Sequence, residues 1–231
     1  MYSIILAAGS GTRIKSITGG NPKQLLFING EPIICRLIRQ LFLAGINKHY
    51  LSTHNNSTLL NDCLYKLNGK YGICNCYESL SSKGANLIHL IKESNNDDEG
   101  AIVTMGDIVF PEETIKAFIN CSKTLHDSEI LVGVSKNMVS SSGKYLNLMN
   151  KKFTRSYSQE CLSSTGLYYL DNKIIKAILD SRKASRCESI TDMFDILTDS
   201  GYQIKMCNIE NHFDINTPSI YEKCKLFFQI K

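Results

Sequence analysis

The sequence predicts an α/β protein with a Rossmann-like, mostly parallel central sheet, helices on both faces and a small additional lobe. Short β-branched runs alternate with helix-like stretches along the chain, a pattern typical of parallel βαβ units. The first apolar run leads directly into a glycine-rich segment. Because such sheets bind ligands beyond the carboxyl ends of their strands, a functional site is expected there.

Individual elements follow from the local residue pattern. The runs expected as strands are 2–6, 49–53, 101–105, 129–134, 166–169 and 203–209. The stretches expected as helices are 32–44, 174–179, 190–197 and 220–228, with a short apolar helix after 82–86 and another helix opened by Pro111. The polar tract 93–99 is expected to be a surface loop.

Length and charge narrow the class of protein. A chain of 231 residues with 43% hydrophobic content is long enough to form one substantial core, so 1–231 is expected to be a single domain. A net charge of +4 does not suggest binding to nucleic acid. The sequence contains neither an apolar stretch of about 20 residues nor a basic leader, so we expect no membrane span and a cytoplasmic location. The nine cysteines contain no C-x-x-C pair and are expected to be reduced thiols.

The loop after the first strand has the features of a phosphate-binding segment. It reads LAAGSGTR, and its glycines allow backbone N–H groups to approach an anion closely. Arg13 adds a planar fork of donors suited to a polyphosphate, and Lys23 follows ten residues later. A dinucleotide fingerprint is excluded because Ile14 occupies the position of its third glycine, and the P-loop ending is absent.

A candidate metal ligand follows the apolar run 101–105. Asp107 is placed at the carboxyl end of this predicted strand, and Mg²⁺ prefers a few carboxylates together with phosphate oxygens. An aspartate at a strand end can equally be a turn or cap residue, so this feature alone does not decide its role.

The segment LAAGSGTR followed by NPKQLL resembles the N-terminal motif of sugar-phosphate and alcohol-phosphate nucleotidyltransferases. These include inositol-phosphate and phosphocholine cytidylyltransferases and glucose-1-phosphate thymidylyltransferases. The resemblance implies Mg²⁺-dependent transfer of a nucleoside monophosphate from a nucleoside triphosphate to a small phosphorylated acceptor, with release of pyrophosphate. It implies that Arg13 and Lys23 are catalytic. The nucleotide would be bound by Leu6, Ala7, Ala8, Gly9, Gly11 and Thr12.

Further segments match the same superfamily less closely. FDINTP near the C-terminus resembles its metal-binding ending, which implies that Asp214 shares the metal with Asp107. Gly84 corresponds to a glycine placed against the nucleobase or ribose, although an ordinary helix-entry glycine explains it equally well. Thr165, Gly166 and Glu188 correspond to acceptor-binding positions, and the acceptor-binding lobe is expected at roughly 136–165.

Three alternatives remain at this point. The group transferred is expected to be a cytidylyl group. The main alternative is transfer of a thymidylyl or uridylyl group to a sugar 1-phosphate. A non-catalytic nucleotide-binding regulatory subunit would be expected to have lost Arg13, Lys23 or an acidic ligand, and all are present. A glycosyltransferase would usually carry an aspartate-x-aspartate metal motif, which Asp107 alone does not make. A homo-oligomer is compatible with the sequence. The sequence does not identify the acceptor.

Overall fold

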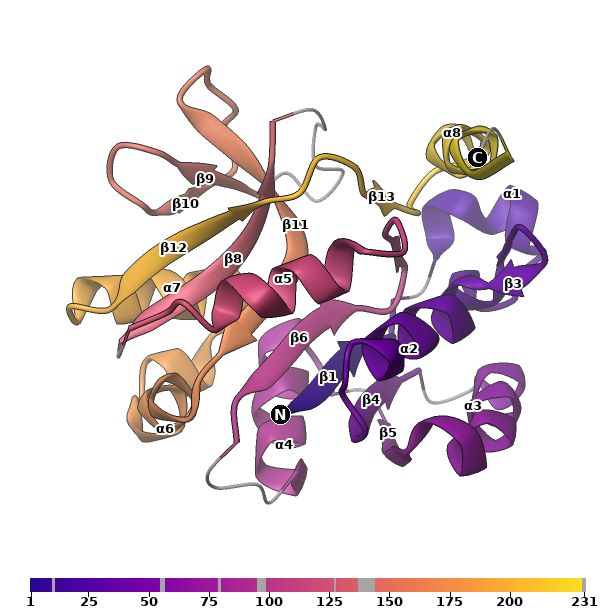
Figure 1. Ribbon diagram of the computed structural model, residues 1–231, viewed down its shortest axis with the longest axis horizontal. Coiled ribbons are helices and arrows are strands. Elements are labelled where there is room, and N and C mark those ends of the chain that lie inside the picture. Colours follow the sequence, from indigo (N-terminus) through magenta and orange to yellow (C-terminus); the bar gives the residue numbers. More distant parts are fainter. Residues whose placement is uncertain are drawn as a thin grey trace.

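A computed structural model describes residues 1–9, 11–54, 57–78, 80–94, 99–126, 128–136 and 144–229, without the side chains of 75–78. The tract 95–98 of the expected surface loop and the segment 137–143 of the expected lobe lie outside the described residues. The Rossmann-like α/β class predicted from the sequence is confirmed. Figure 1 shows a twisted central sheet with helices on both sides.

In the described part of the chain, nine strands form the main sheet, and pairing links seven of them in the order β10-β9-β11-β6-β1-β4-β5. The strands β6, β1, β4 and β5 are parallel, β11 is antiparallel to its neighbours, and β8 and β12 form a parallel pair beside β11. The nine strands are β1 (Tyr2–Leu6), β4 (His49–Thr53), β5 (Ile73–Glu78), β6 (Ala101–Met105), β8 (Glu129–Ser135), β9 (Tyr145–Asn147), β10 (Phe153–Thr154), β11 (Cys161–Leu170) and β12 (Gln203–Asn208).

Two short two-stranded sheets lie outside the main sheet. One pairs β2 (Phe27–Ile28) with β3 (Glu31–Pro32), and the other pairs β7 (Ile108–Val109) with β13 (Phe213–Asp214). The second sheet joins the segment that follows β6 to the segment that precedes the last helix. It therefore brings two distant parts of the sequence to the carboxyl end of β6.

Helices cover both faces of the main sheet. On one face α2 packs against α3 and α5, and on the other α4 packs against α6 and α7; Figure 1 shows α2 and α5 on the near face and α4 on the far face. The helices are α1 (Lys15–Thr18), α2 (Ile33–Leu43), α3 (Thr58–Tyr71), α4 (Lys83–Ser94), α5 (Thr114–Ser122), α6 (Asn172–Asp180), α7 (Ile190–Asp199) and α8 (Pro218–Gln229).

Most of the predicted elements are confirmed, with boundaries that differ by a few residues. Pro111 is an exception, because α5 begins at Thr114 and Pro111 instead accepts a turn hydrogen bond from the Thr114 N–H at 3.1 Å. The pattern also missed α3 and β5. Only Leu60, Leu64 and Tyr71 of α3 are buried, so its apolar periodicity is weak.

Candidate active site

One cavity of about 390 Å³ opens at the carboxyl ends of β1 and β6 and beside the middle of β11. This is the edge of the sheet where the alternation of strands and helices predicted a ligand site. Most of the residues singled out from the sequence line this cavity, although they come from six separate segments of the chain. These are Leu6, Gly9, Gly11, Thr12, Arg13, Lys23, Asp107, Thr165, Gly166, Glu188 and Asp214.

The glycine-rich loop lies against the stem of Lys23. Gly11 has φ of 63°, in the left-handed region that favours glycine, and a short 3-10 turn from Thr12 to Ile14 follows it. A Cβ added at Gly9 or Gly11 would lie 3.5–3.7 Å from the Lys23 side chain. The loop therefore covers the lysine closely while keeping its own backbone at the cavity wall.

Lys23 is almost completely buried, with 4% of its surface exposed. It begins a 3-10 turn after Pro22, and the neighbouring Gln24 anchors that turn by donating a 2.6 Å hydrogen bond to the Ala7 carbonyl. The Lys23 Nζ forms an ion pair with Asp107 and donates a hydrogen bond to the side-chain oxygen of Asn216. A buried ammonium needs such partners, because an unpaired buried charge is strongly unfavourable.

Asp107 and Asp214 come together through the small sheet of β7 and β13. Asp214 is opposite Ile108 in that sheet, and the Ile215 N–H donates to the Asp107 carbonyl at 3.0 Å. Asn216 completes the connection, because its side-chain amide donates to Asp214 while its oxygen accepts from Lys23. The Lys23 ammonium thus contacts Asp107 directly and is linked to Asp214 through the Asn216 side chain.

This donor set fits a divalent cation with a preference for oxygen ligands. The Lys23 ammonium balances one of the two negative charges, so the pair of carboxylates keeps a net negative charge that a cation can neutralise. No group of three or more His, Cys, Asp and Glu side chains arranged to hold a metal occurs among the residues that the structure describes. Two carboxylates match the sparse protein ligation typical of Mg²⁺, which takes its remaining ligands from water and substrate phosphates.

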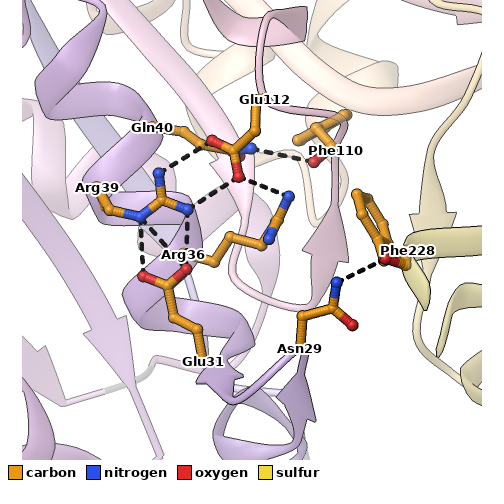
Figure 2. A network of polar contacts seen from close by, with 8 residues as sticks. All are labelled: Asn29, Glu31, Arg36, Arg39, Gln40, Phe110, Glu112 and Phe228. Atoms are coloured by element: carbon orange, nitrogen blue, oxygen red, sulfur yellow. Dashed lines mark hydrogen bonds and ion pairs between the residues drawn. The ribbon is translucent and has the colours of Figure 1, made fainter. Parts of the chain in front are cut away.

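A polar network beneath the site holds the segment around Asp214 in place through α8. Arg39 bridges Glu31 and Glu112, and Arg36 forms a 2.7 Å ion pair with the same Glu112 (Figure 2). The Arg36 guanidinium lies 4.4 Å from the centre of the Phe228 ring on α8. Beside it, Asn29 donates a 2.6 Å hydrogen bond to the Phe228 carbonyl.

Another wall of the cavity is formed by β11. Gly166 has φ of 71°, and a Cβ at this position would come within 2.6 Å of the Ile108 side chain, next to Asp107. Thr165 lines the cavity, and its hydroxyl donates to the Gly133 carbonyl at 2.9 Å. These contacts place Gly166 of β11 against Ile108, next to Asp107, at the cavity wall.

Several predicted residues have structural surroundings that differ from the expected contact. Gly84 is not among the residues lining the cavity, and a Cβ there would lie 1.9 Å from the Cys187 carbonyl oxygen. Its N–H donates to the Glu188 carbonyl at 2.9 Å, so close packing of α4 on this segment accounts for the glycine. Ala7 and Ala8 are also not among the residues lining the cavity. Contacts of these three residues with a nucleotide remain predictions.

The sequence reasoning missed several polar residues that line the cavity. Lys83 directly precedes Gly84, and Asn216 belongs to the FDINTP segment, so proximity to a motif could have indicated both. Lys144 and His212 belong to no motif. Burial lowers the pKa of His212 to about 4, which leaves the imidazole neutral at pH 7.

Tyr168 also lines the cavity as a neutral group. Burial raises the pKa of its hydroxyl to about 12, and that hydroxyl forms a 2.9 Å hydrogen bond with Ser164. The side chains of β11 therefore offer neutral hydroxyl groups to the cavity, whereas the loops after β1 and β6 offer charged side chains.

Comparison with known proteins gives consistent matches. A family model described as nucleotidyl transferase matches residues 2–145. The chain is 25% identical to the bifunctional protein GlmU of Methanococcus maripaludis over 205 residues, which cover 87% of this chain and 48% of that protein. It is also 25% identical to the CTP:phosphoglutamine cytidylyltransferase of Campylobacter jejuni over 179 residues, or 74% of this chain and 64% of that one.

A similar solved structure is that of a Bacillus anthracis protein assigned as a glucose-1-phosphate thymidylyltransferase. It superimposes with a TM-score of 0.82 at 17% identity, covering 99% of this chain and 95% of the other. The chain spans about half the length of the first curated relatives that it matches. In the part of the chain that the structure describes, no helix is both long and apolar enough to cross a membrane.

Proposed function

The chain belongs to the nucleotidyl transferase family, and on that premise we propose that it transfers a nucleoside monophosphate, most readily from CTP, to a phosphorylated alcohol or sugar. Pyrophosphate is the second product. The observation that carries this proposal is the convergence of Lys23, Asp107 and Asp214, through Asn216, at a cavity whose wall is the glycine-rich loop.

The reaction needs positioning and charge neutralisation more than covalent chemistry from the protein. An oxygen of the acceptor phosphate is already an anionic nucleophile, so it attacks the α-phosphorus of the nucleotide without a general base. The bond from that phosphorus to the bridging oxygen of pyrophosphate breaks on the opposite side. Lys23 would neutralise charge at the α-phosphate, and Arg13 would hold the departing pyrophosphate.

Asp107 and Asp214 would hold Mg²⁺, which when bound supplies charge neutralisation and orientation of the phosphate oxygens. The chain itself keeps these carboxylates close together through the β7–β13 pairing and the Asn216 amide. Gly11 and Thr12 would present backbone N–H groups to the triphosphate.

The choice of CTP rests on residues near the site and on one relative. The run 105–110 and the ending FDINTP, followed directly by α8, resemble inositol-phosphate cytidylyltransferases. The Campylobacter jejuni relative is by name a cytidylyltransferase. Thymidylyl or uridylyl transfer to a sugar 1-phosphate is the alternative, because the loop and the PKQLL segment resemble thymidylyltransferases equally well. The acceptor would enter along β11, where Thr165, Gly166 and Glu188 line the cavity.

The test is pyrophosphate release over a matrix of four nucleoside triphosphates and a panel of phosphorylated sugars and alcohols, with Mg²⁺ present. We expect turnover with CTP and one class of acceptor. Thermal stabilisation by each triphosphate gives an independent measure, since a ligand at 100 times its Kd stabilises by about 2.7 kcal/mol. A larger melting shift with dTTP or UTP than with CTP would overturn the base assignment, and no turnover with any pair would overturn the activity.

A further inference from the structure

Lys144 lines the cavity beside β11. It directly precedes β9, and its carbonyl accepts a 3.2 Å hydrogen bond from the Ser164 N–H of β11. The next residue, Tyr145, is in register with Ser163. The backbone of Lys144 is therefore fixed beside the β11 segment that lines the cavity, and its side chain contributes to the same lining.

The order of the strands places Lys144 relative to the other charged groups. In the main sheet β6 lies between β11 and β1, with Asp107 after β6 and the loop carrying Arg13 after β1. Because β8 occupies the other edge of β11, β9 (opposite 161–163) and β6 (opposite 167–170) share one edge, and β9 lies beyond the carboxyl end of β6. In-line attack requires the acceptor to approach from the side opposite the departing pyrophosphate. Lys144, beside Ser164, is on the β11 side of β6, whereas the loop with Arg13, which would hold the pyrophosphate, follows β1 on the other side of β6.

The present partner of the Lys144 ammonium is replaceable. Its Nζ forms a 2.8 Å ion pair with Asp192 in the first turn of α7, and the side chain of Asp192 is 49% exposed. Ion pairs with a partner this exposed contribute little to stability, because water solvates the carboxylate well when the pair is broken. A phosphate dianion in the cavity can therefore take the ammonium from Asp192 at low cost.

We propose that Lys144 binds the phosphate group of the acceptor, exchanging its ion pair with Asp192 for that phosphate, and so determines acceptor binding. This proposal rests on the proposed nucleotidyl transfer. It assigns Lys144 to the acceptor, while Arg13 and Lys23 act on the nucleotide. It also implies that the acceptor phosphate is recognised by a residue outside the N-terminal motif.

The chain offers a matched control for a purely structural role of Lys144. Lys152, which follows β9, forms a 2.5 Å ion pair with Asp199 at the other end of α7. This pair joins the same two parts of the fold, but Lys152 does not line the cavity. Loss of a mere bridge between β9 and α7 would therefore affect Lys152→Gln and Lys144→Gln alike.

The experiment measures KM for each substrate by pyrophosphate release in wild type, Lys144→Gln, Lys144→Arg, Asp192→Asn and Lys152→Gln. We expect Lys144→Gln to raise the acceptor KM about tenfold or more, the effect of losing one charge-assisted hydrogen bond, with the triphosphate KM and the Tm unchanged. Lys144→Arg should recover part of the loss. Asp192→Asn should keep or lower the acceptor KM, and Lys152→Gln should behave as wild type.

The outcomes separate this inference from the activity on which it rests. Turnover in wild type with the same acceptor KM in Lys144→Gln and Lys152→Gln would overturn the role of Lys144. So would a parallel rise in both KM values with a lower Tm. Wild type without turnover on any substrate pair would overturn the proposed function instead. In that case the Tm shift with inorganic phosphate still tests the site: a smaller shift in Lys144→Gln than in Lys152→Gln supports it, and equal shifts contradict it.

Discussion

Lys23 illustrates how the site works at the scale of a single residue. Its ammonium contacts Asp107 and the Asn216 side chain, and its stem lies under Gly9 and Gly11. Because 4% of its surface is exposed, its charge acts in surroundings with little water, where electrostatic interactions are strongest. A buried cation held in this way is preorganised to stabilise negative charge on a phosphate.

Replacing Lys23 is expected to affect chemistry more than folding of the loop. Lys23→Ala should lower kcat/KM by about 10²–10³-fold, the usual cost of removing one preorganised electrostatic group. Lys23→Arg should restore this only in part, because a planar guanidinium does not replace a compact ammonium. Steady-state kinetics check both variants, with Lys15→Ala, an exposed cation of the same segment, as control. Normal kinetics in Lys23→Ala would mean that the loop has another role.

The two carboxylates allow a test of the metal site. Asp107→Asn and Asp214→Asn keep the shape of the side chains but remove the charge that Mg²⁺ requires, so each should nearly abolish turnover while the protein stays folded. Turnover in a Mg²⁺ titration and circular dichroism measure the two properties separately. Asp62→Asn, an exposed carboxylate on α3, serves as the control. Full activity in both variants, or activity that excess chelator leaves unchanged, would contradict a shared metal site.

At the scale of elements, the position of α8 decides whether Asp214 reaches the site. Pro218 begins α8 four residues after Asp214, and the Thr217 hydroxyl accepts a 3.4 Å hydrogen bond from the Ile220 N–H. The Arg36 guanidinium stacks on Phe228, and Glu112 holds that guanidinium in place (Figure 2). The ion-pair network around Arg36 and Arg39 of α2 thus supports α8, although the charged groups of the network all lie outside α8.

This network makes stability depend on pH. Hydrogen bonds from Arg39 hold the pKa of Glu112 below its ordinary value of 4.5, so the ionised form favours the folded state. Its contribution is present above that ordinary value and is lost as pH falls through the lowered pKa. The Tm of wild type should therefore exceed that of Glu112→Gln at pH 7, and the two should converge in acid.

Melting curves between pH 7 and about pH 3, the range in which carboxylates titrate, measure this difference. The neighbouring and exposed Glu113→Gln provides the control. A difference between wild type and Glu112→Gln that stays constant over this range would show that the network contributes no pH-dependent stability.

At the scale of the whole molecule, the buried apolar side chains of the described residues form two clusters. The larger one surrounds the main sheet, and a smaller one lies between α8, the β2–β3 hairpin and the β7–β13 pair. The smaller cluster contains Phe213 and Ile215, the neighbours of Asp214. The metal-binding candidate from the C-terminal segment therefore depends on the smaller cluster, whereas Asp107 follows a strand of the larger one.

The division predicts that function can be lost before the fold. Phe228→Ala removes the side chain with which α8 packs in the smaller cluster, and such truncations cost about 3–5 kcal/mol. Activity of this variant should disappear at a lower temperature than its far-UV circular dichroism. Phe118→Ala in the larger cluster should lose both together. Coincident loss of the two signals in Phe228→Ala would contradict local opening around α8.

Sequence patterns predicted the elements whose signals are local. Short apolar runs gave β1, β4 and β6, and the helical pattern of 220–228 gave most of α8, because both signals depend on neighbouring residues. The pattern failed for α3 and β5. Only a few side chains of α3 are buried, so its apolar periodicity is weak. The strand β5 is recognised mainly by its position at the edge of the main sheet.

The sequence by itself determined the fold class, the family and about half of the residues that line the cavity. Those residues belong to short sequence motifs, which can be recognised from neighbouring residues alone. Tertiary structure alone decided that Lys23 would meet Asn216, 193 residues later, and that Lys144 would face the same cavity. It also decided that Gly84 would lie against the Cys187 carbonyl. These meetings result from the pairing of β7 with β13 and the packing of α4 and α8, and long-range packing of this kind leaves no periodic signal in the residues involved.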